Sequence, residues 1–472
     1  MERIVFQPIR TPEGYYIYDR SVNTIFAVSP DDYENLNQIQ DEDDVDDSPV
    51  VKRFRHMGLL GENRVTMIQH PYTEMLPHFC SSSLSSMVLQ VTQQCNLRCS
   101  YCAYSGAYHN RTHNSAKMCR ETAKKAIDFF LERAKESTTI HLGFYGGEPL
   151  LEFDLIQWCV EYIRNQVEGK GISFGLTTNG TLLTDEIIKF LFDNDFYVTI
   201  SIDGPKEEHD ACRVFPNGKG SFDLVMENIQ RIKELYPGQT KKFSVSTVVS
   251  PKSDLNHVLD YFSTDEILSD TQIMIASLTP NGLKEEVNYQ ESYYQVRRYE
   301  YLKLLLSMLG KLDSKYVSQL VQHARRTNEQ LYRALQRHTK IPERIHHGGP
   351  CIPSVKKLFV MTDGNLFPCE KISESVGCAQ IGTLDEGFDL QKIEDLLNIG
   401  SLTASECKNC WVLPNCKICA AQLEYVSGQK KFTKEDKLPA CKQSKMNVMA
   451  DLYELCVLHE FGYRLNEEVI IL

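Results

Sequence analysis

The stretch Met87-Val-Leu-Gln-Val-Thr92-Gln-Gln-Cys95-Asn-Leu-Arg-Cys99-Ser-Tyr-Cys102 decides the fold of this chain. Its first six residues have the apolar and β-branched composition of a buried strand. Three cysteines follow directly, and thiolates are the usual ligands of four-iron clusters, which normally take four of them. Three thiolates at the end of a strand therefore predict a cluster with one iron left open. Three unrelated cysteines or a zinc ligand set are the alternatives.

Strands and helices alternate on both sides of this stretch, from about residue 85 to 280. Helical patterns occupy 120–136, 184–193 and 221–235, and the second of them begins after Thr184, a capping residue. Repeated strand–helix units predict an α/β fold, a partial (β/α)6 barrel with a parallel sheet and its chemistry at the carboxyl ends of the strands. The strand candidates are 87–92, 140–145, 173–178, 197–202, 243–249 and 272–277.

Polar and glycine-rich segments follow several of these strands. They are Gly146-Gly147-Glu148-Pro149, Thr178-Asn179-Gly180 and Ser201-Ile202-Asp203-Gly204, with Arg213 shortly after the last. Each one alone is also explained as a turn, or for Arg213 as a surface ion pair. Together, at the ends of successive strands, they predict a ligand site in which the glycines allow a close backbone approach.

The spacing Cys-x3-Cys-x2-Cys, with Tyr101 before the third cysteine, resembles the signature of the radical S-adenosylmethionine (SAM) family. The resemblance implies that Cys95, Cys99 and Cys102 hold a catalytic 4Fe–4S cluster whose open iron binds SAM. Reductive cleavage of SAM would then give a 5′-deoxyadenosyl radical. It also implies the SAM-binding residues, which are Tyr101, Gly146, Gly147, Glu148, Pro149, Asn179, Ser201, Asp203 and Arg213.

Seven further cysteines fall into groups after residue 350. They are Cys351, Cys369, Cys407, Cys410, Cys416, Cys419 and Cys441. This arrangement resembles the SPASM extension of radical SAM peptide-modifying enzymes, although Cys416 and Cys419 are separated by two residues where that pattern has three. A zinc site on Cys407, Cys410, Cys416 and Cys419 is the alternative.

The SPASM resemblance implies two auxiliary 4Fe–4S clusters, hence three clusters in the chain. Cys407, Cys410, Cys416 and Cys441 would hold one of them, and Cys351, Cys369 and Cys419 the other. Cys378, nine residues after Cys369, is a candidate for the missing ligand. The other possibility is an open iron that receives a substrate thiolate.

The first eighty residues form a unit of their own. Short strands at 4–9, 14–19 and 23–28 precede a helix that begins at Ser29-Pro30, and a second helix is expected near 50–60. The unit resembles the small α+β, winged-helix-like element that recognises the leader peptide in ribosomal peptide maturases, where a peptide adds a strand to a sheet edge. A plain structural cap on the barrel is the alternative.

The rest of the chain completes a multidomain plan. We expect a leader-recognition element at 1–80, the barrel at 85–280, a helical bridge at 281–345, a loop-rich iron–sulfur domain at 346–456 and a tail at 457–472. The acidic run at 41–47 is interpreted as a solvated loop, or else as a patch that selects a charged peptide.

Composition restricts the partners and the compartment. The net charge of −12 argues against nucleic acid, and no apolar run is long enough for a bilayer. The N-terminus lacks a signal pattern, so a cytoplasmic location is expected. Grouped cysteines in such a compartment favour metal ligands over disulfides.

The resemblances together predict a peptide maturase of the ranthipeptide or sactipeptide type. It would form thioether crosslinks between a cysteine sulfur and a carbon in a ribosomal precursor peptide. Its electrons would come from a reductant protein such as flavodoxin or ferredoxin. The alternatives are a carbon–carbon crosslinking maturase, an anaerobic sulfatase-maturating enzyme that forms formylglycine, and, from another class, a non-enzymatic iron–sulfur electron carrier or a zinc scaffold.

Overall fold

The computed structural model describes residues 4–40, 48–109, 113–239, 242–268, 271–278, 282–335, 339–372, 374–424 and 428–463. The acidic run at 41–47 and residues 464–472 of the expected tail lie outside these ranges. Within them the chain forms a ten-stranded sheet, a three-stranded sheet and a two-stranded sheet.

The parallel half of the large sheet is the expected barrel. It consists of β5 (Ser86–Thr92), β6 (Thr139–Gly146), β7 (Gly171–Thr178), β8 (Phe196–Ser201), β9 (Phe243–Val249) and β10 (Gln272–Ser277), which are neighbours in this order. Every pairing among them is parallel. All six predicted strands are confirmed; β5 is buried along nearly its whole length, whereas β8 and β9 alternate between buried and more exposed residues.

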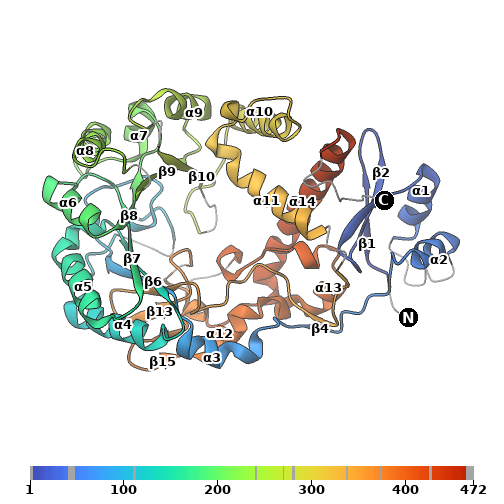
Figure 1. Cartoon of the computed structure of the whole chain (residues 1–472), viewed down its shortest axis with the longest axis horizontal. Coiled ribbons are helices and arrows are strands. Elements are labelled where there is room, and N and C mark those ends of the chain that lie inside the picture. Colours follow the sequence, from blue (N-terminus) through green and yellow to red (C-terminus); the bar gives the residue numbers. More distant parts are fainter. Residues whose placement is uncertain are drawn as a thin grey trace.

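Helices connect and cover these strands, as Figure 1 shows. They are α4 (Arg120–Arg133), α5 (Phe153–Gln166), α6 (Asp185–Asp193), α7 (Lys206–Cys212), α8 (Phe222–Leu235) and α9 (Leu255–Thr264). Thr184 caps α6 as expected, since its hydroxyl accepts a hydrogen bond from the amide of Ile187 at 3.3 Å. Between sheet and helices, Phe144, Phe174 and Phe196 stack with nearly parallel rings in a core that excludes water.

The C-terminal region extends the barrel sheet. Strand β12 (Leu358–Val360) pairs in parallel with β5, and β13 (Asn365–Phe367) continues antiparallel to β12. Two short strands, β14 (Gly382–Thr383) and β15 (Gly387–Phe388), complete the sheet. Strands β12 and β13 form a hairpin that joins the sheet directly beside the strand that leads into Cys95.

The N-terminal unit has three antiparallel strands, β1 (Phe6–Arg10), β2 (Tyr15–Asp19) and β3 (Thr24–Ala27), followed by α1 (Pro30–Gln38) and α2 (Pro49–His56). Phe26 and Ile17 pack in a core of the unit's own. Tyr16 and Tyr18 instead join a core with residues of the C-terminal region. Both faces of the small sheet are therefore covered, and the unit lies far from the barrel strands, against the C-terminal region (Figure 1).

Several helices surround the C-terminal region. They are α3 (Leu76–Ser82), α10 (Glu291–Met308), α11 (Gln322–Leu335), α12 (Leu390–Leu397), α13 (Ala404–Lys408) and α14 (Lys434–Glu460). The 27 residues of α14 form a longer element than we expected in a loop-rich domain, and the helix continues past residue 456. Thr433 and Asp436 form a capping box at its start.

A two-stranded sheet, β4 (Met67–Ile68) with β11 (Arg344–Ile345), links the end of the N-terminal unit to the segment before Cys351. None of the described helices has the length and apolar character that crossing a membrane requires.

Candidate active site and auxiliary cysteine sites

The three cysteines of the first group lie on the loop that follows β5. Cys95 and Cys102 are half-buried and Cys99 is buried. Burial and the neighbouring thiols raise the pKa of Cys95 to about 11 and that of Cys99 to about 12. The raised pKa values mean that ionising these buried thiols is unfavourable. A bound metal cluster would offset that cost, because metal ions stabilise the thiolate. Two backbone hydrogen bonds hold the loop in place: the amide of Arg98 donates to the carbonyl of Val214, and the amide of Ser100 donates to that of Cys212.

Gly146 and Gly147 lie against the backbone that leads to Cys95. A Cβ on Gly146, whose φ is +143°, would lie 1.9 Å from the carbonyl oxygen of Thr92. On Gly147 it would lie 2.2 Å from that of Gln94. The amides of Gly147 and Glu148 donate to those same two carbonyls at 3.0 and 2.9 Å. Only glycine permits this approach, so the first task of the pair is to position the cysteine loop.

Glu148 is completely buried and ties this loop to the end of β7. Its carboxylate accepts hydrogen bonds from the amides of Leu150 and Asn179 and from the Thr178 hydroxyl, at 2.7–3.0 Å. Burial nevertheless raises its pKa to about 7. The structure therefore shows Glu148 as a brace between two of the expected SAM-binding segments, and Pro149 begins the short helix beneath it.

Asp203, Arg213 and Tyr101 form a buried polar cluster beside Cys99. One Asp203 oxygen accepts hydrogen bonds from the Tyr101 hydroxyl and from Nε of Arg213, and the other accepts from the amide of Val248 at 3.0 Å. Arg213 Nη1 lies 3.9 Å from Cys99 Sγ. The cluster brings a positive charge to the thiol, where it would favour the thiolate.

Asn179 lies on the other side of the cysteine loop. Its Nδ2 donates to Asn96 Oδ1 at 2.8 Å and lies 3.7 Å from Cys95 Sγ. Ser201 ends β8, opposite Ser246 of β9. All the residues expected from the barrel motifs thus lie at the carboxyl ends of β5 to β8 or in the loops that follow, as the sequence predicted.

The structure adds a polar network that the sequence analysis missed. Gln90 is fully buried in β5, and its side chain donates to the Tyr104 hydroxyl at 2.9 Å and to Glu374. Gln93 Nε2 donates to Gln90 Oε1 at 3.0 Å. A glutamine inside an apolar strand was the available signal, because buried polar groups need partners. Glu374 could not have been found, since it comes from the C-terminal region.

Four of the later cysteines affect one another's ionisation. Burial, and after it the thiols of Cys407 and Cys416, raise the pKa of Cys410 to about 11 and also raise the pKa of Cys441. Lys437, completely buried, places Nζ 3.8 Å from Cys407 Sγ and donates to Thr403 Oγ1 at 2.7 Å. We call Cys407, Cys410, Cys416 and Cys441 the four-thiol site.

The remaining three cysteines of the SPASM pattern form a second group. Cys419 raises the pKa of Cys369, and Cys351 raises that of Cys419, in each case in addition to burial. The Cys351 side chain is exposed. We call Cys351, Cys369 and Cys419 the three-thiol site.

Cys378 has other neighbours. After burial, the charges acting on its thiol come from Asp436 and Lys392, and its amide donates to the carbonyl of Gln429. It packs in the apolar core of the barrel and sheet. The structure therefore does not bring Cys378 together with the three-thiol site.

All sixteen cysteines are free thiols. In the described ranges no three Cys, His, Asp or Glu side chains converge tightly enough to bind a single metal ion.

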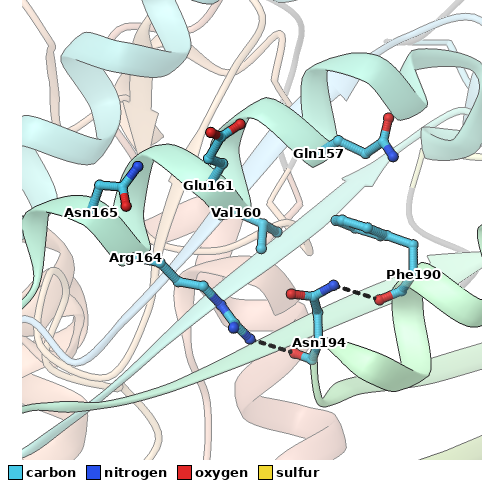
Figure 2. A pocket seen from close by; sticks show the side chains of 7 residues that line it. All are labelled: Gln157, Val160, Glu161, Arg164, Asn165, Phe190 and Asn194. Carbon is cyan, nitrogen blue, oxygen red and sulfur yellow. Dashed lines mark hydrogen bonds between the residues drawn. The ribbon is translucent and has the colours of Figure 1, made fainter.

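Figure 2 shows a groove on the outer surface of the barrel, between α5 and α6. Gln157, Glu161 and Asn165 line it from α5. Two of its polar residues are paired: Arg164 donates to the carbonyl of Asn194, and the Asn194 side chain donates to the carbonyl of Phe190. None of the candidate site residues lines this groove, so it has no part in the chemistry considered below.

Comparison with known proteins identifies the barrel. Residues 89–262 match the sequence model of the Radical SAM superfamily. The chain carries a radical SAM domain. Cys95, Cys99 and Cys102 fall within these residues, and so do all the expected SAM-binding residues.

Two relatives extend the likeness beyond this domain. The cysteine-type anaerobic sulfatase-maturating enzyme of Clostridium novyi is 26% identical over 347 residues, which are 71% of this chain and 87% of that enzyme. The radical SAM cyclopropyl synthase TigE of Paramaledivibacter caminithermalis is 24% identical over 248 residues, 50% of this chain and 49% of that protein. The chain is thus similar to an anaerobic sulfatase-maturating enzyme over a length greater than that of its radical SAM domain.

The fold agrees with a solved structure. Native anSMEcpe with bound AdoMet superposes with a TM-score of 0.57 at 21% identity, covering 79% of this chain and 99% of that one. The same protein bound to AdoMet and the Kp18Cys peptide gives a TM-score of 0.56 at 20% identity, over 79% of this chain and 99% of that one. About a fifth of this radical SAM protein has no counterpart there.

Proposed function

We propose that this radical SAM protein is a peptide maturase that joins a cysteine sulfur to a carbon of another residue in a ribosomal precursor peptide. One observation carries the proposal. The three-thiol site gathers Cys351, Cys369 and Cys419 without Cys378, and Cys351 is exposed. A four-iron cluster on three protein thiolates has one iron left for a substrate thiolate.

The residues present fit the implied cofactors. Cys95, Cys99 and Cys102 would hold the SAM-cleaving cluster, and when bound, that cluster and SAM would supply a 5′-deoxyadenosyl radical that removes one hydrogen atom from the peptide. The buried Lys437 supports an anionic cluster at the four-thiol site, because a buried ammonium requires a counter-charge.

The reaction balances without an external oxidant. The peptide loses one S–H and one C–H hydrogen and gains one C–S bond. One SAM becomes methionine and 5′-deoxyadenosine, and the electron used to cleave it is returned. A reductant protein such as flavodoxin or ferredoxin would supply that electron at the start.

The protein's own residues would orient the reactants. Glu148 and the two glycines fix the loop at the end of β6 against the cysteine loop. Arg213 stabilises negative charge beside Cys99. Gln90 and Glu374 tie β5, the strand that leads to the cysteine loop, to the C-terminal region.

The N-terminal unit is proposed to recognise the leader of that peptide. Helices α1 and α2 pack on one face of its sheet, and the C-terminal region covers the other. A peptide could therefore join the sheet only as an added strand at the β1 or β3 edge, which is a common mode of peptide recognition.

Formation of formylglycine is the second candidate. The observation that favours it is the relation to the sulfatase-maturating enzyme of Clostridium novyi, which extends over 87% of that enzyme. It would also begin with removal of a hydrogen atom from a cysteine residue, so the same cysteine loop serves either reaction.

Product analysis distinguishes the candidates. The reconstituted protein would be incubated with SAM, reductant and either a cysteine-containing precursor peptide or a synthetic cysteine-type sulfatase peptide. A thioether product loses two hydrogens per crosslink, and its cysteine resists alkylation. A product that loses sulfur and reacts with a hydrazide establishes formylglycine. Loss of two hydrogens with every cysteine still alkylatable would instead establish a carbon–carbon crosslink.

A further inference from the structure

Two buried cations flank the four-thiol site, and nothing in the reaction above accounts for them. Lys437 lies one helical turn before Cys441 on α14, and its ammonium is completely buried. It contacts the Cys407 sulfur and the Thr403 hydroxyl. Arg20 follows β2 in the N-terminal unit, is 2% exposed, and donates to the carbonyl of Lys408 at 2.6 Å and to that of Cys410 at 3.4 Å.

Lys437 forms no ion pair with a carboxylate in the part of the chain that the structure describes, and the carboxylate that acts on Arg20 is that of the buried Asp19, next to it in the chain. Arg20 also donates to Asn63, an uncharged amide. The imidazole of His346, near Lys437, is neutral because its Nε2 accepts from the amide of Gly400 while Nδ1 faces the carbonyl of His347. Burying an ammonium and a guanidinium without an anion is costly. The cluster sulfurs are the groups beside Lys437 that can become anionic, whereas Arg20 has the Cys410 sulfur, the buried Asp19 carboxylate and the Tyr18 phenol beside it.

We infer that Lys437 and Arg20 are the counter-charges of an auxiliary cluster on the four-thiol site, and that they make it the more easily reduced of the two auxiliary clusters. The inference rests on the cluster assignment made in the proposed function. Reduction adds one negative charge to a site where solvent screening is weak. A fixed positive charge at the ligand sulfur therefore stabilises the reduced cluster and raises its midpoint potential.

The three-thiol site lacks such an environment. The charges that act on its thiols are Glu370, which is paired with Lys357 at 2.9 Å and partly exposed, and Lys371, which is exposed. A paired and solvated charge changes a potential little. The electron released when the peptide is oxidised would therefore move to the four-thiol site. The N-terminal unit contributes to this electron acceptor, because it supplies Arg20.

The test is a redox titration followed by electron paramagnetic resonance. It would use the full chain with Cys95, Cys99 and Cys102 replaced by Ala, so that only the auxiliary clusters contribute. The three-thiol cluster, identified by its loss in Cys419→Ala, is an internal control. We expect Lys437→Met to lower the midpoint potential of the four-thiol cluster. The oxidised-to-reduced ratio at a fixed potential should change at least tenfold, which corresponds to a shift of about 59 mV for one electron.

Matched variants separate charge from packing. Lys437→Arg keeps the charge and should keep the potential. Lys442→Met removes an exposed lysine adjacent to Cys441 and should shift nothing. Arg20→Met should shift the same cluster in the same direction by less, because Arg20 contacts carbonyls where Lys437 contacts a sulfur. If Lys437→Met and Lys437→Gln bind too little iron to titrate while Lys437→Arg binds it fully, the counter-charge role is likewise supported.

Two results would overturn the inference, and they differ. An intact cluster whose potential is the same in Lys437→Met as in Lys442→Met refutes the role of the cations and leaves the proposed function standing. Absence of iron from the four-thiol site, for example with one zinc in its place, refutes the cluster assignment itself.

Discussion

The two auxiliary cysteine sites differ in burial, charge and connection. The four-thiol site lies beneath α14 and against the N-terminal unit, with Lys437 and Arg20 buried beside it. The three-thiol site has an exposed cysteine and an ion pair that water screens. Under the proposed function, the closed site would store an electron and the open site would meet the substrate.

The N-terminal unit is attached to the same helices that surround the four-thiol site. Its sheet shares a core with α11 and α14, and Glu460 of α14 accepts hydrogen bonds from Thr11 and Tyr16. Removing residues 1–80 would therefore expose the four-thiol site as well as remove a peptide-binding edge. Point substitutions at Arg20 test the connection more cleanly than a deletion does.

The largest effect is expected from the cysteines that belong to neither auxiliary site. Replacing Cys95, Cys99 and Cys102 together by Ala should abolish reductive SAM cleavage, because no other described loop combines three thiols with the ends of β5 to β8. About one third of the iron should be lost, with roughly eight irons remaining on the two auxiliary sites. Chromatography of 5′-deoxyadenosine and iron analysis measure both, and continued formation of 5′-deoxyadenosine would refute the assignment.

The next prediction compares the auxiliary sites by stability. Cys407→Ala should destabilise the fold by about 3–5 kcal/mol, because loss of the cluster leaves Lys437 buried without an anion. Cys351→Ala should cost less than about 1 kcal/mol, since its side chain is exposed and no cation depends on it. Anaerobic denaturant titration of both reconstituted variants provides the comparison. If both variants lose the same free energy of unfolding, the four-thiol site does not depend on neutralising a buried cation any more than the three-thiol site does.

A smaller effect is expected from an added thiol. A cysteine-containing peptide should change the paramagnetic resonance spectrum of the reduced three-thiol cluster, which has an open iron, and leave that of the four-thiol cluster unchanged. The same peptide with serine in place of cysteine is the control. A response at the four-thiol site, or at neither, would remove the basis for thiolate capture.

The sequence predicted the barrel well because its information is local. Each strand was a short segment rich in apolar and β-branched residues, and Thr184 showed where α6 begins. The residues at the strand ends were found for the same reason. The sequence did not predict that β12 pairs with β5 or that Glu374 reaches Gln90, since these contacts join segments about 270–284 residues apart. Nor does any local pattern distinguish Lys437 from the exposed Lys442.

The smallest effect is expected at Cys378, and it decides whether the three-thiol site is open. Its thiol packs among apolar neighbours, including Val376, Ala379 and Ile381, and burial raises its pKa to about 11. Ionisation at this position is unfavourable unless metal is bound, and the other three sulfurs do not act on it. We therefore expect Cys378→Ala to retain the full iron content and thiol response, and to cost only about 1 kcal/mol from the lost buried atom. Loss of the three-thiol cluster would make Cys378 the fourth ligand, so that a substrate thiolate could no longer reach an open iron. The cluster would then only transfer electrons, and the carbon–carbon crosslink and formylglycine reactions would become the better candidates.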